Sequence, residues 1–125
     1  MDTLRIKNAK YAKECTEVNL SNRQITKIGN FEFFPYLEVL VLNNNKLKRL
    51  DNLDANFRIK ELFIDKNLMS SLGGSIRKFK FINYLSAAEN NIRNLEKHVF
   101  KFFFIDQNKI GVIKHFFQNM ILMKI

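Results

Sequence analysis

The chain has 125 residues, of which 46% are hydrophobic, and it carries 13 Phe, no Trp and a net charge of +9. This length predicts one domain, and no stretch reaches the ~20 apolar residues that a membrane span needs. The single cysteine, Cys15, excludes an internal disulfide, and no charged-then-apolar leader precedes it. We therefore expect an intracellular protein in a reducing compartment, the cytoplasm.

The positive charge is spread over several segments, near the N-terminus, at 46–49 and at 77–80. A basic surface can attract nucleic acid, the acidic tails of tubulin or membrane phosphates. Because these residues are dispersed and no RNA-binding motif accompanies them, we interpret them as a solubilising surface. Nucleic acid remains the alternative partner.

The N-terminal flank, residues 1–14, lacks Pro and Gly and predicts a short capping helix with Asp2 as its N-cap. Leu4, Tyr11 and Ala12 would share one face and shield the open edge of the segment that follows. The alternation of Leu4 and Ile6 is also compatible with a short strand.

Four asparagines, at positions 45, 67, 90 and 108, lie within the same apolar frame. Apolar residues occur eight, five and three positions before each asparagine and two and five positions after it: Leu37, Leu40, Leu42, Leu47 and Leu50; Ile59, Leu62, Ile64, Met69 and Leu72; Ile82, Leu85, Ala87, Ile92 and Leu95; and Phe100, Phe103, Ile105, Ile110 and Ile113. The frame also fits one unit earlier, with Arg23 at the asparagine position. We expect this arginine to be solvated.

Each unit predicts a short strand, a turn and a return segment. In the second unit Leu40 and Leu42 point inward while Val39 and Val41 point outward, because side chains alternate along a strand. One unit cannot bury its apolar face alone, so neighbouring units must stack. The asparagine amide can then satisfy buried backbone groups in its own turn and the adjacent one.

This LxxLxLxxNxL pattern resembles the leucine-rich-repeat family. Periods of 22, 22, 23 and 18 residues resemble its short-repeat class, which includes a phosphatase regulatory subunit, a spliceosomal scaffold subunit and dynein-associated ciliary proteins. The resemblance implies an α/β solenoid, a right-handed horseshoe with a parallel concave sheet and short 3₁₀ or extended convex segments. It covers residues 15–113, about five units, of which the fourth is shortened.

The return segments should close the back of the core with Phe31, Phe34, Leu53, Phe57, Ile76 and Phe79, and the extra residue of the third interval should fall near Gly73-Gly74. Residues 114–125 form an atypical apolar tail, in which Phe116, Phe117 and Met120 could cover the last repeat. The uncharged run 102–105 lies at the last edge of the sheet and could instead promote self-association.

No enzyme constellation is present, so we expect no catalysis, no cofactor and no metal. Gly73-Gly74 lacks the lysine-serine pair of a phosphate loop. His98 and His115 have neither a cysteine nor a paired acid near them. Cys15 occupies an inward repeat position and has no histidine partner in register, so we assign it to core packing.

The outward residues of the strands define the expected binding surface. They lie two, four and six positions before each asparagine and include Ser86 of the fourth strand. Val39, Val41, Phe63 and Tyr84 form an apolar strip with acidic residues beside it, which is typical of a partner site. The predicted partner-binding residues are Val39, Val41, Glu61, Phe63, Asp65 and Tyr84. Strand propensity alone could also explain these choices.

These features predict a non-catalytic protein–protein interaction scaffold that holds a partner segment on the concave face. The family resemblance makes a ciliary or cytoskeletal complex a reasonable setting. The alternatives are a ribonucleoprotein-associated subunit that uses the basic surface, with a nuclear location, and a phosphatase regulatory subunit.

Overall fold

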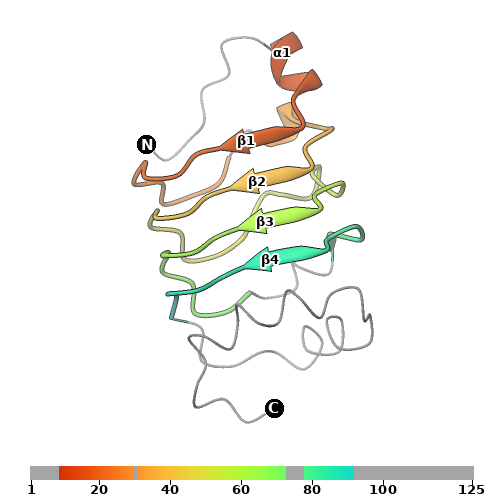
Figure 1. Ribbon diagram of the computed structural model, residues 1–125. Coiled ribbons are helices and arrows are strands. Elements are labelled where there is room, and N and C mark those ends of the chain that lie inside the picture. The colour runs from red at the N-terminus through yellow and green to blue at the C-terminus, as the bar shows by residue number, and fades with distance from the viewer. Residues whose placement is uncertain (1–8, 30, 73–77, 92–125) are drawn as a thin grey trace.

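The computed structural model describes residues 9–29, 31–72 and 78–91, and in them the chain winds into a solenoid with one parallel sheet (Figure 1). The elements are α1 (Ala9–Glu14), β1 (Glu17–Asn19), the 3₁₀ helix η1 (Phe31–Phe33), β2 (Val39–Val41), β3 (Glu61–Phe63) and β4 (Tyr84–Ser86). The strand order in the sheet is β1-β2-β3-β4, the order of the sequence. This confirms the predicted fold class, with extended and 3₁₀ return segments opposite the sheet.

The sheet register follows the repeat period. Glu17, Val39, Glu61 and Tyr84 are partners across the four strands. The buried positions keep the same register up to Leu72 and again from Phe79, so the extra residue of the third unit lies between these two. The expected position near Gly73-Gly74 falls outside the described residues.

The core consists of stacked rows of equivalent side chains. The central strand positions Leu40, Leu62 and Leu85 are completely buried, and in the first repeat Val18 is only partly buried against the same core. Each row places an apolar side chain directly on its equivalent in the next repeat. The neighbouring repeats therefore supply the burial that a single unit lacks.

One return-segment prediction was wrong. Phe31, Phe34, Leu53 and Phe79 are buried as expected, but Phe57 is 46% exposed and its neighbour Asn56 is 0% exposed. The Asn56 side-chain Nδ2 donates to the carbonyls of Phe31, at 2.8 Å, and Phe34, at 3.0 Å. Because this amide must face the core to satisfy the preceding turn, the adjacent ring points out.

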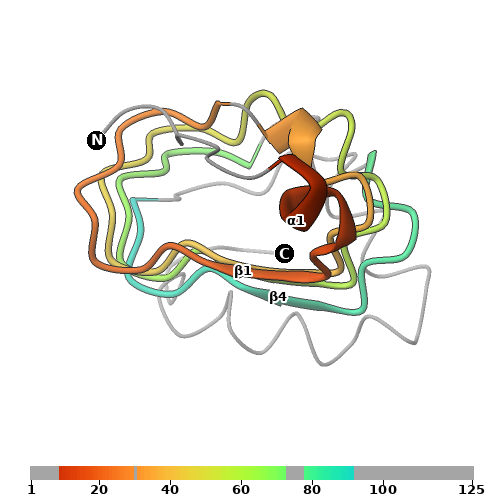
Figure 2. The ribbon, with the colours of Figure 1, turned by 90° about the horizontal axis from the view of Figure 1, so that it is seen from above.

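The N-terminal helix lies over the end of the solenoid at β1 (Figure 2). Ala12 is buried in the core cluster, and Cys15 packs against that cluster while partly exposed. The prediction that Tyr11 shares the shielding face was wrong, since its side chain is 69% exposed. A helix of six residues presents only a narrow inward stripe, and Ala12 occupies it. Asp2, Leu4 and Ile6 lie outside the described residues.

The C-terminal predictions also fall outside the described residues. They concern the unit around Asn108, the strand run 102–105 and the tail 114–125. Ile76, which was predicted to lie in the core as part of the third return segment, is also outside the described residues. Cover of the last repeat and self-association through that edge stay predictions. Within the described ranges, no helix is long and apolar enough to cross a membrane.

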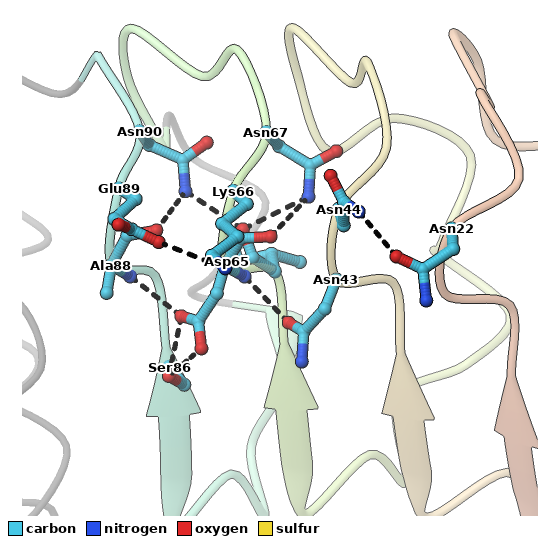
Figure 3. Close-up of polar contacts among 11 residues, drawn as sticks. Asn22, Asn43, Asn44, Asp65, Lys66, Asn67, Ser86, Ala88, Glu89 and Asn90 are labelled. Atoms are coloured by element: carbon cyan, nitrogen blue, oxygen red, sulfur yellow. Dashed lines mark hydrogen bonds and ion pairs between the residues drawn. The ribbon is translucent and has the colours of Figure 1, made fainter.

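In each of the four described repeats, the residue immediately before the repeat-asparagine position (Arg23 in the first repeat) has a left-handed backbone conformation with positive φ. Asn22, Asn44, Lys66 and Glu89 have φ values of 60°, 56°, 55° and 54°. Asn22 and Asn44 suit this conformation, and the Nδ2 of Asn44 donates to the Oδ1 of Asn22 across the repeats (Figure 3). Lys66 suits it less well, and its ammonium lies 3.8 Å from the Glu89 carboxylate.

We expect Lys66→Asn to raise the free energy of unfolding by about 0.5–1 kcal/mol, because asparagine tolerates left-handed backbone and can extend the side-chain ladder. The ion pair that it gives up is exposed and contributes little. Urea unfolding measures the change. Lys48→Asn is the matched control, since Lys48 is exposed and has no positive φ. A gain no larger than that of the control contradicts the assignment of strain to Lys66.

Candidate functional site

The outward sheet face consists of Val39, Val41, Glu61, Phe63 and Tyr84, which alternate with the buried strand residues. All five are partly buried. Val41 is the strand partner of Phe63, and Val39 and Tyr84 flank Glu61. The rings of Phe63 and Tyr84 lie 5.1 Å apart between centroids, tilted by 38°. The structure thus brings these five predicted residues together on three adjacent strands.

The sixth predicted residue, Asp65, lies just beyond β3, and its carboxylate is bonded within the protein. It accepts hydrogen bonds from the Ser86 hydroxyl, at 2.6 and 2.8 Å, and from the Ala88 backbone N–H, at 2.7 Å (Figure 3). Ser86 was predicted to face outward, but it is only 2% exposed. The carboxylate of Asp65 therefore orients the turn of the next repeat as well as bordering the face.

A similar hydrogen bond, in which a side-chain oxygen accepts the backbone N–H of the equivalent residue in the next repeat, occurs one repeat earlier. The Oδ1 of Asn43 accepts the backbone N–H of Asp65 at 2.8 Å. In the first repeat this position is Ser21, whose backbone N–H donates locally to the Oδ1 of Asn19 at 3.0 Å. The side chains of Asn43 and Asp65 thus hold successive turns at a constant spacing, and so keep the outward residues in register.

The repeat asparagines provide the main connection beneath this face. Asn67 donates to the carbonyl of Leu42, at 2.9 Å, in the preceding repeat, and to those of Ile64 and Asp65, at 3.1 and 3.2 Å, in its own. Its Oδ1 accepts the N–H of Leu47 at 3.1 Å. The side chain thus satisfies polar groups in two repeats, as the sequence predicted.

Asn45 and Asn90 make equivalent bonds, including those from Asn45 to the carbonyl of Leu20 and from Asn90 to that of Ile64. Arg23 occupies the first position of the row and is exposed, as expected. Its backbone N–H donates to the Oδ1 of Asn45 at 3.1 Å. The first repeat has no asparagine of its own at this position, and the side chain of Asn45 in the second repeat bonds its backbone.

A row of exposed residues at the strand entries, two of which are aromatic, was not identified from the sequence. Tyr36 and Phe81 lie three residues before β2 and β4, and Arg58 lies at the equivalent position before β3. Their exposure could have been inferred from the repeat frame, because this column lies one position before the inward column of Leu37, Ile59 and Ile82. It borders a groove at the strand entries, described below.

Within the part of the chain that the structure describes, no three His, Cys, Asp or Glu side chains lie together in a way that could hold a metal ion. Cys15 is a free thiol. His98, His115 and Gly73-Gly74 lie outside the described residues.

We expect Asn67→Ala to lower the free energy of unfolding by about 1–3 kcal/mol, because it leaves the Leu47 N–H without its acceptor and removes one of the two side-chain amides that donate to the Leu42 carbonyl. Equilibrium urea unfolding measures this loss. Asn83→Ala is the matched control, since Asn83 is exposed, and it should change stability by less than about 0.5 kcal/mol. Equal midpoints for the two variants contradict the role given to the ladder.

Comparison with known proteins agrees with this geometry. Residues 13–55 match the family model described as "Leucine Rich repeats (2 copies)". The chain is also similar to the U2 small nuclear ribonucleoprotein A' of Aspergillus fumigatus, with 27% identity over 97 residues that cover 74% of this chain and 38% of that protein. The chain thus spans well under half the length of that relative. With the parallel sheet and the asparagine ladder, this match over residues 13–55 supports the assignment of the fold as a leucine-rich-repeat solenoid.

Proposed function

We propose that the protein is a non-catalytic interaction scaffold that holds a segment of a partner protein against the outward sheet face, the concave side in solenoids of this kind. The observation that carries this proposal is the tilted ring pair of Phe63 and Tyr84. Both rings lie on the face opposite the core, so the fold does not require them there. Aromatic side chains of this kind are frequent anchors in protein interfaces.

The neighbouring residues favour a partner with an apolar stripe. Val39 and Val41 extend the aromatic pair across β2, and Glu61 lies between Val39 and Tyr84 in the register. A helix or an extended segment with apolar residues along one side and a cation opposite Glu61 would match this pattern. The face is also preorganised, because backbone bonds and side-chain ladders fix its spacing, and this reduces the entropy lost on binding.

A ribonucleoprotein setting is supported by the similarity to a small nuclear ribonucleoprotein component. It also agrees with the net charge of +9, which could attract RNA directly. This setting would place the protein in the nucleus, in place of the cytoplasm expected from cysteine usage. Ciliary, cytoskeletal and phosphatase settings rest on the resemblance to the short-repeat class alone, so we favour the ribonucleoprotein setting among them.

We expect Phe63→Glu to abolish capture of the partner by the full chain, because it places a carboxylate within the apolar strip. Tyr84→Glu should have the same effect. Affinity capture followed by mass spectrometry measures the loss, while circular dichroism and the thermal midpoint show that the fold persists. The matched control is the pair Lys48→Glu and Arg49→Glu, on exposed turn residues, which should retain the partner.

Two conditions separate protein binding from RNA binding. Phosphate-dominated binding weakens by orders of magnitude between about 50 and 200 mM salt, whereas binding through aromatic anchors changes little. Capture should therefore survive both higher salt and ribonuclease. Loss of capture from the Lys48 and Arg49 pair alone, or upon ribonuclease treatment, would refute the protein-scaffold proposal and transfer the site to the basic surface.

A further inference from the structure

The edge where the chain enters the strands carries a second exposed apolar surface. Tyr36 and Phe57 are both 46% exposed, and Phe81 is 57% exposed. Phe57 and Phe81 line a groove together with Glu38, Arg58 and Lys60. Glu38 and Lys60 immediately precede β2 and β3, so this groove lies beside the sheet and shares no residue with the outward sheet face.

Arg58 is the cation of this groove whose guanidinium remains available. It lies over the Tyr36 ring at 5.1 Å and over the Phe57 ring at 5.7 Å from the centroids. It makes no ion pair with the residues that the structure describes. Because a guanidinium that packs on rings keeps its N–H groups in its own plane, it can still bind a carboxylate through two parallel hydrogen bonds.

The other cation that lines the groove, Lys60, is paired. The ammonium of Lys60 lies 3.1 Å from the Glu38 carboxylate, and Lys78 is paired with Asp54. The groove thus offers one uncommitted positive charge next to exposed rings. Its lining also contains the Glu38 carboxylate, which repels a continuous chain of phosphates. Single-stranded nucleic acid is bound by a track of cations along its backbone, so this charge pattern fits a single carboxylate better.

We propose that this groove binds a peptide segment that carries an acidic residue next to a large apolar residue. The carboxylate binds the guanidinium of Arg58, and the apolar side chain packs against Phe57 and Phe81. The site is independent of the interaction through the outward sheet face, and each can be removed without the other.

Selection of short random peptides on the immobilised full chain tests the proposal. The wild-type protein should enrich peptides with Asp or Glu beside Phe, Leu, Ile or Met, and Arg58→Gln should lose this group. Fluorescence anisotropy with one synthetic peptide of this group should then show binding weakened about tenfold by Arg58→Gln, the size of effect expected from a charge-assisted bidentate contact. Phe63→Glu and the matched control Arg49→Gln should leave its affinity unchanged.

A double-mutant cycle localises the contact. Replacing the acidic residue of the peptide by its amide should weaken binding to the wild type about as much as Arg58→Gln does, and should add little further loss to that variant. Enriched peptides without an acidic residue, or equal affinity of Arg58→Gln and wild type, would overturn the proposal. The proposal would also be overturned, in favour of nucleic acid, if a labelled oligouridylate bound the wild-type protein more tightly than the peptide does and this binding depended on Arg58.

Discussion

The buried side-chain amide of the repeat asparagine is the interaction on which the rest of this structure depends. Each strand has only three residues, so the sheet ladder ends where the chain turns away. Beyond that point Asn45, Asn67 and Asn90 satisfy carbonyls in their own repeat and in the preceding one. An unsatisfied carbonyl or N–H in this position would cost about 1–3 kcal/mol. The amide therefore sets the distance and register between neighbouring repeats.

A constant register between repeats arranges equivalent side chains in rows. The inward rows determine the stability of the fold, and the outward rows determine the chemistry of its surface. The inward rows, such as Leu40, Leu62 and Leu85, build the core. The outward rows are free of this constraint and can carry residues for recognition. Two such surfaces result, the face with Phe63 and Tyr84 and the groove beside Arg58. Both are properties of the stack, since each takes residues from at least two repeats.

The sequence predicts this fold well because the pattern is periodic. Five apolar positions around each asparagine are enough to place the strands, the inward columns and the outward face. Predictions failed where one repeat has a different residue type at a buried position. Asn56 occupies a buried position of the return segment that is aromatic in other repeats, because its amide donates to two carbonyls of the preceding repeat. These carbonyls belong to residues 22 and 25 positions away, so the local sequence does not indicate the requirement.

The candidate surfaces were predictable to different degrees. The alternation of strand residues placed Val39, Val41, Glu61, Phe63 and Tyr84 on one face. The bonds of Asp65 with Ser86 and Ala88 could not be inferred, because they depend on the path of the turn after the strand. The groove beside Arg58 was missed for a different reason. The repeat frame places Tyr36, Arg58 and Phe81 one position before an inward column, but Phe57 was assigned to the core, so its exposure beside them was not expected.

The most direct test of the ladder is native-state hydrogen exchange of the backbone amides that donate to asparagine Oδ1 atoms, those of Ile25, Leu47 and Met69. The reference amides are those of Leu42 and Ile64, which donate to backbone carbonyls of the next repeat. If the asparagines connect the repeats, both groups should exchange only through the same cooperative opening, with comparable protection. Exchange of Ile25, Leu47 and Met69 at the rate of exposed turn amides, while Leu42 and Ile64 stay protected, would contradict this account.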